Sequence, residues 1–281
     1  MNLTRSFLFV CLLSVAPFFT GAGALSPKDK AASLYPADVK RFPVIWQEGG
    51  FNLEAHRGLS DLYPENTELS FAKAAELGTK AYRGMETDVQ RTSDGVLVCF
   101  HDSKLRRTTG EEGSVGDYTY EKLRTFDAGR GERIPLFKTY LEYCRKAGFI
   151  PYVELKGVDG DGIRQTIDEI HAAGYKDGEF VLTSFVKQRL EFASTLCDTP
   201  LEYMKETFTS EDLDAMGGIR NLVVRPAARH LTEAFVQECR RRGIPLECYG
   251  LPVSDKTLYN QLKTWGVRGC TCNSYVVTLS S

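Results

Sequence analysis

The chain has 281 residues, a formal net charge of −2 and a pI near 6.2. Hydrophobic residues make up 42% of it and charged residues 26%, which is ordinary for a globular protein. This balance excludes a global basic field that would attract nucleic acid or an anionic membrane. Any affinity for a phosphate-bearing ligand must therefore come from a local site, and we expect no nucleic-acid partner. The sequence leaves the oligomeric state open.

Residues 1–24 have the pattern of an export signal. Arg5 supplies the positive charge, residues 7–19 form a short apolar core, and residues 22–24 offer small side chains at a cleavage site. The apolar run is too short to span a bilayer comfortably, and no stop-transfer pattern follows it. We therefore expect an exported protein, periplasmic or secreted, without a stable membrane anchor.

The cysteines that follow this segment do not have the pattern of a disulfide framework, because their number is odd and they are scattered through expected strands and helices. Buried free thiols are the expectation. One disulfide within the group Cys248, Cys270 and Cys272 remains an alternative in an oxidising compartment. The seven are Cys99, Cys144, Cys197, Cys239, Cys248, Cys270 and Cys272.

Residues 25–50 are mixed in character and predict a leader draped over the domain, and residues 51–281 predict a single α/β domain. In that domain short β-branched or apolar runs alternate with helical patterns, which is typical of βα units around a parallel sheet. We expect an (α/β)8 TIM-type barrel. The predicted strands are Leu53–His56, Arg83–Asp88, Val96–His101, Ile150–Leu155, Phe180–Ser184, Leu201–Met204, Asn221–Arg225, Pro245–Tyr249 and Val267–Cys272. The predicted helices are Thr67–Leu77, Leu136–Ala147, Gly162–Ala172, Lys187–Thr195, Thr232–Arg242 and Lys256–Trp265.

The second and third predicted strands are too close in sequence to be joined by a parallel crossover. Asp94-Gly95 between them is a strong hairpin signal. We therefore predict an antiparallel excursion, which leaves eight parallel places. A two-residue turn at this point would put Asp88 opposite His101. The long connection over residues 102–135 predicts a small insertion over the barrel mouth.

Acidic side chains follow one face of two predicted strands. Glu86 and Asp88 are two residues apart, so both point to the same side of their strand, as do Glu154 and Lys156. Carboxylates that share a face repel one another unless a cation or a proton lies between them. Three carboxylates with open positions suit a hard cation such as Ca²⁺ or Mg²⁺. Taken singly, the acid pair could instead be a solvated face, and Glu154 with Lys156 a salt bridge.

The chain has only four histidines, and His56 and His101 both end predicted strands. Barrel enzymes keep their active sites at such carboxyl ends. Arg57 adds a cation suited to bidentate phosphate contact. His171 and His230 lie in or beside helical segments, and we assign them structural roles.

Two more polar residues are expected to be structural, and a third is a weaker candidate for the site. Glu54 shares a face with His56, so it would point into the barrel, where an acid must be paired or protonated. Glu65 would cap the helix that begins near Thr67. Asn66 is a weaker candidate for the site.

These motifs, in this order, resemble the glycerophosphodiester phosphodiesterase family. The resemblance is dense over residues 52–157 and then thins, with Ser184-Phe185 as the last clear match. It is carried by His56-Arg57-Gly58, Pro64 to Thr67, Glu86-x-Asp88, Asp94-Gly95, His101-Asp102, Leu105 to Gly110, Ile134-Pro135 and Glu154-x-Lys156.

The resemblance implies metal-dependent hydrolysis of a glycerophosphodiester to glycerol 3-phosphate and an alcohol. Glu86, Asp88 and Glu154 would bind the divalent metal, Ca²⁺ or Mg²⁺. His56 and His101 would act as the general acid/base pair and would titrate near neutral pH. The substrate's own glycerol hydroxyl would attack first, giving a cyclic phosphate that water opens.

The resemblance also assigns Arg57 and Lys156 to the phosphate oxygens. It weakens in the last third of the chain, where the family's Trp-Thr-x-Asn is replaced by Tyr249 to Pro252 and its closing Thr-Asp by Cys272-Asn273. Tyr249 would either stack on the substrate or simply pack. Two rival interpretations remain: a barrel lipase of the sphingomyelinase D or phospholipase D type, and a catalytically silent protein that binds glycerophosphodiesters.

Overall fold

The computed structural model describes residues 40–47, 50–217, 219–252 and 255–273. The predicted export signal and most of the predicted leader therefore lie outside the described residues. Within the described residues, none of the helices combines the length and the apolar character needed to cross a bilayer.

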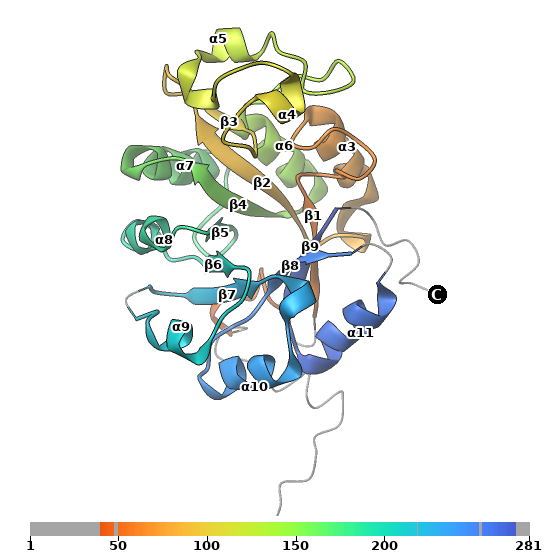
Figure 1. The fold of residues 1–281 in the computed structure, drawn as a ribbon, viewed down its shortest axis with the longest axis vertical. Coiled ribbons are helices and arrows are strands. Elements are labelled where there is room, and N and C mark those ends of the chain that lie inside the picture. The colour runs from red at the N-terminus through yellow and green to blue at the C-terminus, as the bar shows by residue number, and fades with distance from the viewer. Residues whose placement is uncertain (1–39, 48–49, 218, 253–254, 274–281) are drawn as a thin grey trace, which may run out of the picture.

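The strands form one nine-stranded sheet whose path runs β7-β6-β5-β4-β2-β1-β9-β8, with β3 attached to β2 (Figure 1). All pairings along this path are parallel. Parallel bridges at Val224–Leu246 and Ala227–Tyr249 join its two ends. The predicted (α/β)8 barrel is confirmed. The strands are β1 (Asn52–His56), β2 (Gly84–Arg91), β3 (Leu97–Cys99), β4 (Ile150–Gly157), β5 (Val181–Ser184), β6 (Leu201–Lys205), β7 (Leu222–Pro226), β8 (Cys248–Leu251) and β9 (Gly269–Cys272).

The longer helices surround this sheet and bury one face each against it, whereas α4 and α5 belong to the insertion described below. All six predicted helices are present within two residues of their predicted bounds, and α11 matches at both ends. Helix α9 was not predicted from the sequence. The α-helices are α3 (Glu68–Leu77), α4 (Arg106–Thr109), α5 (Tyr120–Leu123), α6 (Phe137–Ala147), α7 (Gly160–Ala172), α8 (Lys187–Ala193), α9 (Ser210–Asp214), α10 (Glu233–Arg241) and α11 (Lys256–Trp265). The short 3₁₀ helices are η1 (Gly78–Lys80), η2 (Val115–Asp117) and η3 (Ala228–His230).

The antiparallel hairpin of β2 and β3 is confirmed, but its predicted register is wrong. Val89 pairs with Cys99, and the Phe100 amide donates to the Asp88 carbonyl at 2.9 Å. The turn has three residues, since the Thr92 amide donates to Val96 across it, and Gly95 takes the left-handed conformation with φ +84°. The register is therefore shifted by one residue, so that Phe100 lies opposite Asp88 and His101 lies beyond the paired strand.

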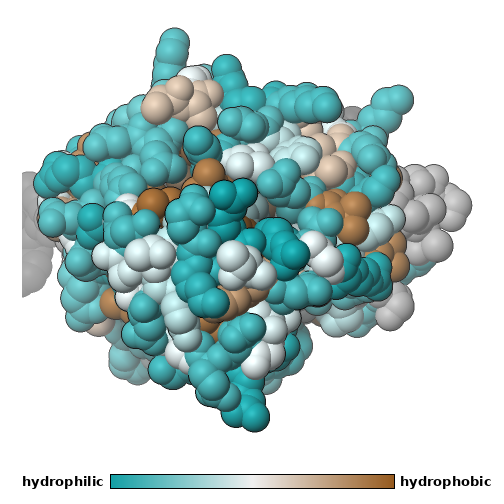
Figure 2. Space-filling view, turned by 90° about the horizontal axis from the view of Figure 1, so that it is seen from above, coloured by the Kyte–Doolittle hydropathy of each residue, from teal (hydrophilic) through white to brown (hydrophobic). Residues whose placement is uncertain are grey.

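The predicted insertion after this hairpin contains α4, η2 and α5, at the top of Figure 1. It has a core of its own, separate from that of the barrel. The face seen from above it is mainly hydrophilic, with apolar side chains in small separate areas (Figure 2). The buried members of the insertion core are Val98, Phe100, Leu105, Val115, Leu123, Phe126, Ala128 and Ile134.

The last part of the predicted leader does not simply lie over the domain. Phe42, Ile45 and Trp46 are buried in one cluster with residues that begin β4, β5 and β7. They therefore close the amino-terminal end of the barrel. The Asn52 side chain fixes this segment by donating to the Ile45 carbonyl at 2.9 Å.

A charged cluster fills the barrel interior next to the segment that closes its amino-terminal end. Arg225 on β7 pairs with Glu54, Glu202 and Glu247, and all four side chains are at most 1% exposed. Trp46 Nε1 donates to Glu247 Oε1 at 2.7 Å. The structural role predicted for Glu54 is confirmed. Burial raises the pKa of Glu54 and of Glu202 well above the usual range, although Arg225 opposes the shift.

All seven described cysteines are free and buried thiols. Cys248 and Cys270 are neighbours in register on β8 and β9. Burial raises the pKa of Cys248 well above its usual range, so its thiol is a poor nucleophile.

The interior charge cluster makes stability depend on pH. Since their pKa values are raised in the folded chain, Glu54 and Glu202 bind protons more tightly there than in the unfolded chain, which releases them above about pH 4.3. The free energy of unfolding should therefore fall as pH rises above that value. Urea unfolding with chelator at several pH values should show this slope, and Glu202→Gln should flatten it because an amide does not titrate there.

The control is Glu121→Gln, since the Glu121 side chain is 78% exposed on α5. It should keep the slope of the parent protein. An equal slope in Glu202→Gln and in the parent would contradict the assignment of these protons to the barrel interior.

Candidate functional site

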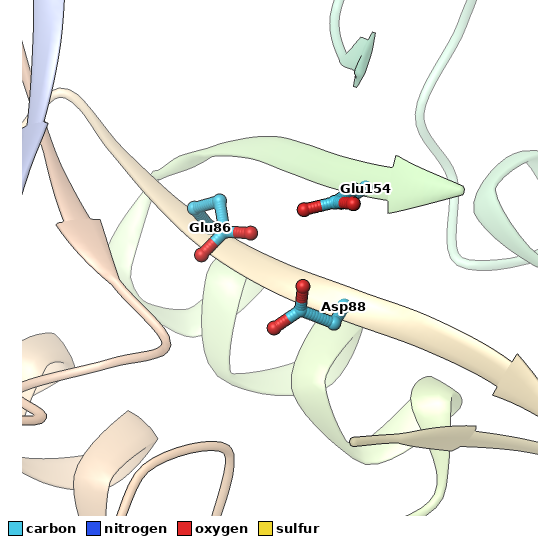
Figure 3. A group of neighbouring side chains, drawn as sticks. All are labelled: Glu86, Asp88 and Glu154. Carbon is cyan, nitrogen blue, oxygen red and sulfur yellow. The ribbon is translucent and has the colours of Figure 1, made fainter. Parts of the chain in front are cut away.

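Three buried carboxylates converge at the carboxyl end of the barrel. Glu86 and Asp88 project from β2 and Glu154 projects from β4 into one shared space (Figure 3). The parallel register sets Asp88 beside Glu154. Each residue offers a carboxylate oxygen, and these atoms lie within 4.8 Å of one another. The structure thus brings together the three acids that the sequence predicted for a metal site.

The electrostatics of this acid cluster are unfavourable without added positive charge. Burial and the nearby Asp88 raise the pKa of Glu86 well above its usual range and that of Glu154 to about 7. Burial also acts to raise the pKa of Asp88, but Arg57, with help from His101 and Lys156, lowers it. One carboxylate is therefore held charged while its neighbours are driven towards their protonated forms.

The acid cluster fits a hard divalent cation. Asp88 Oδ1 is buried and has no hydrogen-bond partner among the described residues. A carboxylate oxygen left in this state is costly unless a cation completes it. Three oxygen donors from side chains suit Ca²⁺ or Mg²⁺, which keep water or a substrate oxygen in their remaining positions.

Asn66 holds Asp88 in its orientation. Its Nδ2 donates to Asp88 Oδ2 at 2.9 Å, and its Oδ1 accepts from the Thr87 hydroxyl at 2.7 Å. Asn66 is 3% exposed and has a left-handed backbone with φ +52°, which Asn tolerates better than most residues. The weaker candidate from the sequence thus contacts the acid cluster directly.

The Arg57 segment forms a tight corner after β1. Arg57 Nε lies 3.3 Å from Asp88 Oδ2, and the Arg57 amide donates to Glu86 Oε2 at 3.1 Å. Gly58 has φ +77°, and a Cβ there would lie 2.6 Å from the Ser70 backbone. Glycine is therefore required for this corner, which holds Arg57 against the acid cluster.

The cap predicted for Glu65 is wrong. Thr67 is the N-cap of α3 and accepts from the Ser70 amide. Glu65 instead accepts from Arg57 Nη1 at 2.9 Å and from Arg107 Nη2 at 2.6 Å. It links the corner after β1 to the insertion.

His101 is oriented from the insertion side. Its Nδ1 lies 2.6 Å from Asp102 Oδ1, and Arg107 donates to both oxygens of Asp102. The hydrogen bond from Arg107 is the main cause that lowers the pKa of Asp102 to about 2, so this carboxylate stays ionised. Its acceptor oxygen favours the tautomer with a proton on Nδ1 of His101.

Lys156 lies at the centre of the predicted residues. Its Nζ is 3.0 Å from Glu154 Oε1, 3.9 Å from Asp88 Oδ1 and 3.1 Å from His101 Nε2. The ammonium group also lies 5.7 Å from the ring centroid of Phe185. The lysine thus touches both the acid cluster and one histidine.

His56 faces the same space from β1. Its Nε2 lies 3.8 Å from Glu86 Oε2, and its Nδ1 lies 2.5 Å from Asn273 Oδ1. Burial and the positive charge of Arg57 lower the pKa of His56 to about 4. The expectation that both histidines titrate near neutrality is therefore wrong for His56.

Sequence reasoning missed Asp102 and Arg107 as orienting residues, and Asn273 as the partner of His56. A signal existed for Asp102, because it directly follows a candidate histidine. Arg107 lies within the motif Leu105 to Gly110, but nothing in that motif indicates its contact with Glu65, which joins positions 42 apart. His171 contacts Asp177 at 3.0 Å, on the helical layer and outside the acid cluster.

A parallel barrel that carries, at the carboxyl ends of its strands, an acid cluster able to hold a metal ion and two oriented histidines has the kind of site that suits a metal-assisted hydrolase. Comparison with known families agrees. Residues 56–275 match the model of the glycerophosphoryl diester phosphodiesterase family, and the chain belongs to this family.

Relatives with curated names support this assignment. The chain is 43% identical over 109 residues to the glycerophosphodiester phosphodiesterase of Caldanaerobacter subterraneus subsp. tengcongensis, a match that covers 36% of this chain and 44% of that protein. A Bacillus subtilis protein of the same name is 27% identical over 248 residues, which covers 78% of this chain and 82% of that one. The match to another, uncharacterised B. subtilis protein covers 61% of its length at 33% identity, so the chain spans only 44–61% of these two relatives.

Solved structures share the fold. A phosphodiesterase of Oleispira antarctica, solved with its product sn-glycerol-3-phosphate, has a TM-score of 0.74 at 22% identity and covers 81% of this chain and 94% of its own. A glycerophosphodiester phosphodiesterase of Thermotoga maritima has a TM-score of 0.63 at 24% identity and covers 82% of this chain and 97% of its own.

The contact between Asn66 and Asp88 should tune metal affinity. Asn66→Gly removes the side-chain amide, and glycine tolerates the backbone conformation at this position, φ +52°. We expect Ca²⁺ or Mg²⁺ to bind about 10- to 100-fold more weakly, as is usual when an orienting partner of a metal ligand is lost. Isothermal titration calorimetry of the metal alone measures this change.

Asn221→Gly is the matched control, because Asn221 also has a positive φ (+58°) and donates from Nδ2 to an acid, Asp198, away from the acid cluster. It should leave metal affinity unchanged. Equal affinities in the two variants would show that Asn66 does not orient a metal ligand.

Proposed function

We propose that the chain is an exported, metal-dependent glycerophosphodiester phosphodiesterase. It would hydrolyse glycerophosphodiesters to glycerol 3-phosphate and an alcohol. The observation that carries the proposal is the acid cluster of Glu86, Asp88 and Glu154, all buried, within 4.8 Å of one another. Family membership supports the substrate class, as does the product held by the Oleispira antarctica relative.

Glu86, Asp88 and Glu154 would hold Ca²⁺ or Mg²⁺, which supplies a positive charge that stabilises developing charge on a phosphate oxygen. Arg57 and Lys156 lie on either side of Asp88, at 3.3 Å and 3.9 Å. They would bind the other phosphate oxygens, Arg57 through a planar guanidinium and Lys156 as a mobile point charge.

The two histidines differ in the partner of Nδ1. For His56 it is the neutral amide oxygen of Asn273, which accepts a hydrogen bond from Nδ1–H. The lone pair of His56 is then on Nε2. His56 would therefore take the proton of the attacking hydroxyl. For His101 it is the carboxylate of Asp102, which would offset the charge of a protonated ring once Lys156, 3.1 Å from Nε2, has turned to the phosphate. His101 would therefore give its proton to the departing alcohol.

The first step would form a bond from the glycerol 2-hydroxyl to phosphorus and break the bond to the alcohol. His56 then carries the proton of the hydroxyl, and His101 has lost one. Water would open the cyclic phosphate in the second step, with the histidines exchanging roles, so that both return to their starting states.

The two rival functions have less support. A silent binding protein does not require two histidines whose Nδ1 atoms are each held by a partner at 2.5–2.6 Å. A sphingomyelinase D or phospholipase D-like lipase would use a similar metal and histidine set, but the family match over residues 56–275 favours the glycerophosphodiesterase.

The decisive experiment measures glycerol 3-phosphate released from glycerophosphocholine and glycerophosphoethanolamine. We expect activity to vanish in chelator and to return with Ca²⁺ or Mg²⁺. Glu86→Gln should lower kcat/KM by at least about 100-fold at saturating metal, because it removes a charged metal ligand with little change in shape.

Glu112→Gln is the control for the loss of one negative charge, since Glu112 is 76% exposed in the insertion. It should keep full activity. Turnover that persists in chelator, or in Glu86→Gln, would refute the metal-dependent mechanism. Choline release from lysophosphatidylcholine, without turnover of glycerophosphodiesters, would favour the lipase.

A further inference from the structure

The side of the barrel mouth opposite β2 carries residues that the reaction above does not use. We define the far wall as Phe185, Glu206, Arg229, His230 and Tyr249. Phe185, Glu206 and the pair Arg229–His230 follow the carboxyl ends of β5, β6 and β7, and Tyr249 lies within β8. Strands β2 and β7 are the farthest apart in the closed ring. The phosphate would lie on the acid cluster beside β2, so one of its two substituents extends towards the far wall.

Lys156 connects the acid cluster to the far wall. Its ammonium group contacts Glu154 and also lies 5.7 Å from the Phe185 ring centroid. The Phe185 ring in turn packs edge-on against Tyr249, with centroids 5.7 Å apart at 78°. Burial and a hydrogen bond to Glu206, with a contribution from Glu154, raise the pKa of Tyr249 to about 12. A continuous series of side-chain contacts therefore joins the far wall to the acid cluster.

The carboxylate of the far wall is already satisfied by its neighbours. Glu206 accepts from the Tyr249 hydroxyl at 3.1 Å, pairs with Arg229, and lies 3.0 Å from His230 Nε2. Arg229 is 65% exposed, and its Nη1 has no hydrogen-bond partner among the described residues. The group that the far wall offers to a ligand is therefore a guanidinium, with an imidazole beside it.

We propose that the far wall is the subsite for the departing alcohol and that Arg229 selects alcohols carrying an anionic group, such as a carboxylate. This inference rests on the proposed function. The alcohol would leave next to His101, whose Nε2 is 3.1 Å from Lys156 Nζ. Lys156 in turn contacts the Phe185 ring of the far wall. A guanidinium binds carboxylates and phosphates through parallel hydrogen bonds.

A quaternary ammonium group is disfavoured at the far wall. Such groups bind best to open aromatic faces near an uncompensated carboxylate. Here Lys156 already lies over the Phe185 ring, and Glu206 is engaged by Arg229 and Tyr249. The positive charges of Lys156 and Arg229 would both repel the ligand.

The test compares glycerophosphoserine with glycerophosphoethanolamine, which differ by one carboxylate. The readout is the ratio of their kcat/KM values at saturating metal. We expect the parent protein to prefer the serine diester by about three- to tenfold, and Arg229→Gln to bring the ratio close to one. Raising the ionic strength should shrink the preference, because the guanidinium is exposed.

Two further variants make the test specific. Glu206→Gln removes the charge that competes for Arg229, so the ratio should rise, in the direction opposite to Arg229→Gln. Arg241→Gln is the control, because Arg241 is 67% exposed on α10 and pairs with Glu238. It should leave the ratio unchanged.

Turnover of both substrates with the same ratio in the parent and in Arg229→Gln would overturn the subsite and leave the proposed function intact. A parent protein that prefers the ethanolamine diester would overturn it as well. Turnover of neither substrate would overturn the proposed function and the subsite together.

Discussion

The structure depends on one electrostatic constraint, the burial of Glu86, Asp88 and Glu154 at the same end of one barrel. Three carboxylates held within 4.8 Å would repel one another, so the surrounding chain supplies cations. Arg57 and Lys156 contact the acid cluster directly. The corner after β1 holds Arg57 against the acid cluster, and Gly58 and Asn66 take left-handed backbone conformations within it. A divalent ion bound to these carboxylates, as we propose, would complete the same charge balance.

A second charged layer lies deeper in the barrel, where Arg225 is surrounded by three glutamates. The charge of Arg225 also lowers the pKa of Glu86, against the larger effects of burial and of Asp88. The two layers therefore share one interior. Trp46 ties the lower layer to the segment that closes the barrel, so the chain before β1 contributes to the packing beneath the site.

The sequence predicted the barrel because runs with a strand-like pattern alternate with runs that have the apolar spacing of a helix. Such patterns depend only on residues close together in the chain. It also predicted the acids, since alternation on β2 and β4 puts Glu86, Asp88 and Glu154 on inward faces. The hairpin register was wrong because Gly95 permits a three-residue turn as readily as a two-residue one. Contacts such as Glu65 with Arg107 and His56 with Asn273 join distant positions, and no local pattern reports which partner a side chain will find.

The most direct test of the central claim is a crystal structure grown with Mn²⁺, with the ion located by its anomalous scattering. We predict one strong peak within about 2.0–2.6 Å of carboxylate oxygens of Glu86, Asp88 and Glu154, with Lys156 turned away from Glu154. A protein that binds no ion there, with Lys156 still paired to Glu154, would contradict the claim that this acid cluster is a metal centre.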